Sequence, residues 1–162
     1  MYGVDGDSLS RWYKHFISDY EAWEQRYHAS DYVLFKENLG EKLSMDETSL
    51  SQGELYTIIT NKSAHGGKGS LVAMIKGTKS DDIIYYLSKL PRHKRLKVKE
   101  ITIDLSPSMR LIAKRAFPNA TIVSDRFHVQ KLMNEATSDL RVDYRWQAID
   151  QENTEIAFAK DL

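Results

Sequence analysis

Residues 98–117, with the sequence VKEITIDLSPSMRLIAKRAF, decide the fold class. Val98 to Asp104 alternates between apolar and polar residues, as a half-buried strand does, and the run ends in an acid. Ser106-Pro107 then supplies a hydroxyl cap followed by proline at the first helical position, and apolar residues recur at helical spacing until Pro118. Because another short strand follows at 120–124, strands and helices alternate here, which predicts an α/β fold.

Three further strands are predicted upstream of this stretch. Residues 43–50, 54–61 and 71–76 are short runs rich in Ile, Val, Thr and Tyr, and the short loops between them predict antiparallel hairpins. Helical spacing predicts a helix that Ser80 caps and that runs through Leu90, and a last helix that carries Val129. From residue 43 onward the predicted order is therefore βββαβαβα.

The first part of the chain is rich in aromatic residues at helical spacing. They predict a long helix over about 9–27, whose apolar stripe is more typical of a core or an interface than of a platform for stacking bases. Residues 28–42 form a mixed connector. We therefore expect two parts: an N-terminal helical segment over 1–42 and an α/β domain over 43–162.

Composition excludes several classes of protein. The 162 residues suffice for about one domain, and the absence of cysteine excludes disulfide frameworks and thiolate chemistry. No apolar run is long enough to span a bilayer, and residues 1–5 have neither the basic start nor the apolar core of a signal peptide, so we expect a cytoplasmic protein without a membrane partner. Since 23 basic residues balance 23 acidic ones, binding of nucleic acid would require local patches.

Three acids lie within or just after predicted strands: Asp46, Asp104 and Asp125. Where strands run parallel, their carboxyl ends meet at one edge of the sheet, and ligands bind there in open α/β folds. Two carboxylates at that edge repel each other unless one binds a proton or a divalent cation lies between them. Mg²⁺ prefers oxygen ligands, and two such ions about 4 Å apart can catalyse phosphodiester chemistry.

Local structure explains the same acids equally well at this stage. Asp104 and Asp125 each precede a predicted helix and are placed to form turns or caps there. His65 and His128 show no metal-ligand spacing and are typical of polar surface. An aspartyl phosphatase is disfavoured, because Thr48 stands where that chemistry requires a second acid.

Three segments together resemble one known family. The chain is similar to bacterial insertion-sequence transposases of the ISL-three group, which are DDE enzymes with an RNase H-like catalytic domain, over about residues 28–153. The resemblance is carried by Ser44-Met45-Asp46-Glu47-Thr48-Ser49-Leu50-Ser51-Gln52-Gly53-Glu54-Leu55-Tyr56, by Ile101-Thr102-Ile103-Asp104-Leu105-Ser106-Pro107-Ser108-Met109, and by Asp125-Arg126-Phe127-His128-Val129-Gln130-Lys131-Leu132.

The resemblance implies roles for these residues. Asp46 and Asp104 would be the first two acids of the DDE set and would jointly bind two Mg²⁺ or Mn²⁺ ions. Asp125 would lie at the edge of the site with His128 beside it. The partner would be double-stranded DNA, both at transposon ends and at the target. The protein would be located in the bacterial cytoplasm, associated with the nucleoid. A homo-oligomer is possible.

The sequence also departs from the family pattern. The third acid of the family, a Glu on a helix well downstream, has no counterpart before Leu162, so the chain looks cut short. We therefore expect weak metal binding and little or no strand transfer by this chain alone. The alternative is a catalytically inactive remnant that only binds DNA or regulates transposition.

Two segments are candidates for contact with DNA. Residues 2–13 resemble the turn and recognition helix of a helix-turn-helix. In that interpretation, the side chains that face DNA are those of Ser8, Ser10, Arg11 and Lys14. A packing helix that links domains explains the many aromatic residues of this segment better. The second candidate is the run 92–99, where five of eight residues are Lys or Arg, including Arg92, Lys94 and Arg95. Such a run is otherwise an ordinary solvated loop.

Overall fold

The computed structural model describes residues 3, 5–50 and 53–160. By their internal contacts these form two compact units, one up to Val123 and one from Ser124 onward. The predicted boundary between residues 42 and 43 stays a prediction.

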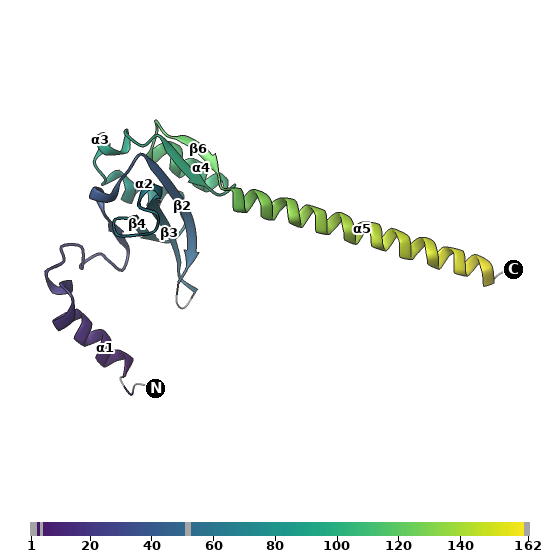
Figure 1. The fold of residues 1–162 in the computed structure, drawn as a ribbon, viewed down its shortest axis with the longest axis horizontal. Coiled ribbons are helices and arrows are strands. Elements are labelled where there is room, and N and C mark those ends of the chain that lie inside the picture. Colours follow the sequence, from purple (N-terminus) through teal and green to yellow (C-terminus); the bar gives the residue numbers. More distant parts are fainter. Residues whose placement is uncertain (1–2, 4, 51–52, 161–162) are drawn as a thin grey trace. The chain divides into compact units, whose positions relative to one another are not determined.

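A six-stranded mixed sheet is the centre of the first unit, and its strand order is β1-β4-β3-β2-β5-β6. Figure 1 labels β2, β3, β4 and β6 of this sheet. The strands are β1 (Tyr32–Leu34), β2 (Lys42–Ser49), β3 (Leu55–Asn61), β4 (Leu71–Lys76), β5 (Glu100–Ile103) and β6 (Thr121–Ser124). The helices are α1 (Gly6–Trp12), α2 (Ser80–Ser88), α3 (Arg92–Arg95), α4 (Pro107–Ala116) and α5 (Arg126–Lys160). From β2 onward this confirms the predicted order, with the short α3 added.

The direction of the strands follows the predicted pattern as well. β2 pairs antiparallel with β3, and β3 pairs antiparallel with β4, so the three form consecutive hairpins. On its other side β2 pairs with β5 in parallel. The first and fourth predicted strands are therefore parallel neighbours, as in an RNase H-like sheet.

Alternate residues of the strands pack against α2 and α4 to form the core. Leu43, Met45 and Ile59 from the sheet are fully buried together with Leu87 of α2 and Ile112 of α4. The buried hydroxyl of Thr57 is satisfied, because it donates to the carbonyl of Gly77 at 2.9 Å. The hydrophobic contacts of α2 and α4 fix the position of the turn that follows β5.

Proline begins α4 as the sequence predicts, but the predicted hydroxyl cap was wrong, because the side chain of Ser106 makes no capping hydrogen bond and bonds the hydroxyl of Ser108 instead. Ser106 has an extended backbone at the cap and Pro107 occupies the first turn. At α2 the prediction was wrong by one residue, since Lys79 lies at the cap and Ser80 is already helical.

The predicted helix over 9–27 was also wrong. α1 continues only through a π-helical segment, η1 (Tyr13–Ile17), after which Ser18 is extended. The backbone N–H and the hydroxyl of Ser18 both donate to the carbonyl of Tyr13, which closes the helix. Serine side chains compete for backbone hydrogen bonds in this way. Much of the aromatic stripe predicted for this segment is exposed, and the exposed fraction of Phe16 is 82%.

Sequence periodicity missed β1 because the strand is only three residues long. It adds to the edge of the sheet through Val33, which pairs with Met74. Gln25 holds the preceding segment to this strand: its side-chain amide donates to the carbonyl of Leu34 and accepts from the N–H of Leu34, both at 2.8 Å.

The second unit is essentially one helix, α5, drawn as a continuous ribbon in Figure 1. It has 35 residues, none of them buried. Within the described residues, no helix has both the length and the hydropathy needed to cross a bilayer.

Neighbouring residues of α4 test the importance of its buried face. We expect Ile112→Ala to lower the free energy of unfolding by about 2–5 kcal/mol, because Ile112 is fully buried. Leu111→Ala, at a residue 42% exposed on the same helix, should lower it by about 1 kcal/mol or less. Urea denaturation followed by circular dichroism measures both, and equal losses would contradict the packing described.

Candidate active site

The parallel pair β2 and β5 brings Asp46 and Asp104 to the same end of the sheet. Ser44 is the register partner of Thr102, and each acid lies two residues further along its strand direction. Asp46 is within β2, whereas Asp104 is the first residue after β5. Continuing the register by two residues makes the two acids neighbouring positions, one within the second half of β2 and the other at the carboxyl end of β5.

Each of these carboxylates accepts a hydrogen bond from nearby backbone. The Oδ1 atom of Asp46 accepts from the N–H of Glu47 at 2.8 Å, and the Oδ1 atom of Asp104 accepts from the N–H of Ser106 at 2.9 Å. The turn-forming role considered for Asp104 is therefore present in the structure. It uses one lone pair, and an ionised carboxylate has about four such sites, so acceptor capacity remains.

Glu47 belongs to the same cluster of acids. Its pKa is raised, first by partial burial of its carboxyl, then by the negative charge of Asp104, and then by that of Asp46. Like charges close together disfavour ionisation, so this shift indicates that the carboxyl groups of Asp104 and Asp46 lie close enough to Glu47 to act on it.

Sequence reasoning missed Glu47, although a signal was present. Leu43, Met45 and Glu47 follow the period of two that defines the core face of β2, and the first two are fully buried. Glu47 is next in this period but is exposed, so an acid interrupts the apolar pattern of this face of the strand.

The chemistry of these oxygens fits a hard divalent cation. Asp46 and Asp104 supply carboxylate ligands, and the repulsion felt by Glu47 is what a bound cation would relieve. Among the residues described, no group of three or more His, Cys, Asp or Glu side chains is arranged to hold a metal ion. The described residues therefore supply two carboxylate ligands that would suit a divalent metal ion, Asp46 and Asp104.

Asp125 and His128 lie in the second unit, at the start of α5. The Oδ1 atom of Asp125 accepts from the N–H of Phe127 at 2.9 Å, so Asp125 stabilises the beginning of that helix, as its position before a helix predicted. The ring of His128 packs edge-on against that of Phe127, with 5.7 Å between the centroids. A role for either residue at the edge of the active site stays a prediction.

The residues predicted to face DNA near the N-terminus occupy α1 and η1. Ser8 is engaged in capping α1, because its N–H and its hydroxyl both donate to Asp5. Ser10, Arg11 and Lys14 are exposed, and the Nζ atom of Lys14 lies 5.4 Å from the centre of the Tyr20 ring. Contact of these residues with DNA stays a prediction.

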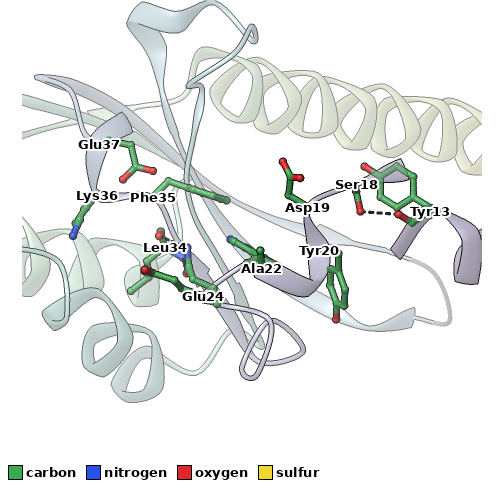
Figure 2. A pocket seen from close by; sticks show the side chains of 12 residues that line it. Tyr13, Ser18, Asp19, Tyr20, Ala22, Glu24, Leu34, Phe35, Lys36 and Glu37 are labelled. Carbon is green, nitrogen blue, oxygen red and sulfur yellow. Dashed lines mark hydrogen bonds between the residues drawn. The ribbon is translucent and has the colours of Figure 1, made fainter. Parts of the chain in front are cut away.

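A pocket that the sequence did not predict lies between this N-terminal segment and the strand β1 (Figure 2). It has a volume of about 920 Å³ and combines aromatic side chains such as Tyr20 and Phe35 with the acids Asp19, Glu24 and Glu37. The pocket contains none of the acids of the sheet edge.

The strand order and directions define an RNase H-like α/β domain. The family model DDE_Tnp_ISL3, described as "Transposase", matches residues 43–161, which is most of the chain. The protein therefore belongs to the ISL-three group of transposases. No curated protein matches its sequence significantly.

Removal of one charge tests the acid cluster. In Asp104→Asn, measured without divalent ions, the pKa of Glu47 should fall toward its ordinary value, because the largest charge effect on it is removed. Asp46→Asn should lower this pKa by less. Titration followed by NMR of the carboxyl carbon measures both.

Glu41→Gln provides the control, since residue 41 is six positions, or about 20 Å, from Glu47 along β2. An unchanged pKa of Glu47 in Asp104→Asn would show that the two carboxyl groups do not interact.

Proposed function

We propose that this chain supplies part of the metal-dependent, DNA-cutting site of a DDE transposase, with Asp46 and Asp104 as two of its ligands. The observation that carries the proposal is the parallel pairing of β2 with β5, which positions both acids at one end of the sheet. Membership of the transposase family makes DNA the expected substrate.

The side chains would act mainly by positioning. The N–H of Ser106 orients one oxygen of Asp104, and the N–H of Glu47 does the same for Asp46, which leaves the other oxygens to bind cations. Divalent ions at such a site activate the attacking oxygen and stabilise the leaving oxygen of a phosphodiester. Asp125 and His128 are proposed to line the edge of the site.

In the family this chemistry nicks the transposon end, after which the freed 3′ hydroxyl attacks target DNA. We propose that the same two steps apply to the site to which this chain contributes. The third acid of the family has no counterpart here, so the chain alone should bind Mg²⁺ or Mn²⁺ weakly and transfer strands little. We propose that the protein acts on DNA in the bacterial cytoplasm.

Metal binding tests the assignment of the ligands. Electron paramagnetic resonance of Mn²⁺ should show weak binding to the wild type, and Asp46→Asn or Asp104→Asn should weaken it about tenfold or more, equivalent to about 1.4 kcal/mol, since each removes a ligand. Glu41→Gln, an exposed acid at the other end of β2, should bind Mn²⁺ like the wild type. Equal affinity in all four proteins would refute the assignment.

Nicking of supercoiled plasmid tests the reaction itself. The wild type should nick slowly and only with Mg²⁺ or Mn²⁺, and Asp46→Asn should abolish the reaction because activation by the ions is removed. Robust Asp46-dependent cleavage would contradict the expectation that a missing acid limits the chain. Salt-dependent DNA binding without any metal-dependent cleavage would favour the inactive remnant.

A further inference from the structure

A second concave site lies at the far end of α4 from Asp104. It is a pocket of about 210 Å³ between α3 and the end of α4, and its lining consists of Arg92, Arg95, Leu96, Arg115 and Pro118. Three of these five residues are arginines and none is acidic. We call it the arginine pocket.

Arg95 builds the pocket and joins its two walls. Its Nε atom donates to the carbonyl of Leu90 at 3.2 Å, and its Nη1 atom donates to the carbonyl of Ala116 at 2.8 Å. The guanidinium thus ties the segment before α3 to the last residue of α4. Because both bonds are to backbone carbonyls, its positive charge is not neutralised.

Arg92 and Arg115 form no such bonds to the backbone of the residues that the structure describes. Both are exposed, and within residues 3, 5–50 and 53–160 neither they nor Arg95 form an ion pair. By contrast, Lys99, which belongs to the same basic run 92–99, forms an ion pair with Glu41 at 2.8 Å. The pocket therefore concentrates positive charge on a chain with a net charge of zero.

Further cations continue this charge along the surface. Lys94 and Lys97 belong to α3 or follow it, and Lys114 precedes Arg115 on α4. A row of cations suits a polyanion better than a single small anion, because each neighbouring phosphate meets its own positive charge.

We propose that the arginine pocket binds a backbone phosphate of double-stranded DNA. The planar fork of donors on arginine matches a phosphate bidentately, and two exposed arginines face a pocket whose third arginine is held in place. The inference rests on the proposed function in that it assigns a contact to the DNA substrate.

The separation between the arginine pocket and Asp104 would allow one continuous DNA duplex to contact both. α4 begins next to Asp104 and its 10 residues span about 15 Å to Ala116, which corresponds to four or five base pairs at roughly 34 Å per turn of ten. A duplex that runs from the sheet edge along α4 would therefore bring a phosphate to the pocket.

The pocket also changes which cations are expected to contact DNA. The sequence indicated Arg92, Lys94 and Arg95, but the Nζ atom of Lys94 donates to the carbonyl of Lys36 at 2.9 Å and does not line the pocket. Arg115, 20 positions beyond Arg95, completes it.

The test is duplex binding measured by fluorescence anisotropy over a range of salt concentrations. The double variant Arg92→Ala with Arg115→Ala should bind at least about tenfold more weakly, and the slope of log K against log salt should decrease by about 0.9 for each phosphate that the variant no longer neutralises. Arg95 is left unchanged because of its bonds to the backbone. Arg141→Ala with Arg145→Ala, two exposed arginines of α5, is the control of equal charge and should bind like the wild type.

Equal affinity and slope in the two double variants would overturn the inference, as would a wild type that binds no DNA. Displacement of the duplex by inorganic phosphate at constant ionic strength would assign the pocket to a small anion and would also overturn it.

The outcomes separate this inference from the proposed function. If Mn²⁺ binding and nicking depend on Asp46 while the arginine variant binds DNA normally, the pocket is wrong and the function stands. If the arginine variant loses DNA binding while Asp46→Asn leaves metal binding unchanged, the pocket stands and the metal site is wrong.

Discussion

Parallel pairing of β2 with β5 is the constraint on which the rest of the structure depends. Parallel neighbours cannot be joined by a tight turn, so the chain between them must leave the strand and return. It does so through β3, β4, α2 and the short α3, and the buried faces of α2 and α4 pack with the strands into one core. Packing of this core thereby positions two acids that are 58 residues apart in sequence, at 46 and 104.

Gathering acids at one end of a sheet opposes stability, and the structure shows how this is accommodated. The raised pKa of Glu47 records the repulsion, while backbone N–H groups of Glu47 and Ser106 stabilise the two aspartates. Positive charge is concentrated instead at the other end of α4, around Arg92 and Arg115. Such local conflicts in an otherwise consistent sequence are typical of functional sites.

Periodicity and turn signals predicted β2 to β5 and α4, including the proline at the start of α4. It failed where local hydrogen bonds compete with a pattern, as at Ser18, and where an element is as short as β1. Resemblance to the family singled out Asp46 and Asp104 as metal ligands, a role that stays a prediction. Glu47 and Arg115 were not identified, because their significance depends on neighbours brought close only by the tertiary fold.

Proximity of positions 46 and 104 is the central claim, and a chain without cysteine permits a direct measurement of it. Asp46→Cys with Asp104→Cys introduces a single pair of thiols, and Asp46→Cys with Glu100→Cys is the matched control, since residue 100 lies four positions, or about 13 Å, further back along β5. A reagent that fluoresces only when it joins two neighbouring thiols should label the first pair much faster than the second. Equal rates, or faster labelling of the control pair, would contradict the account.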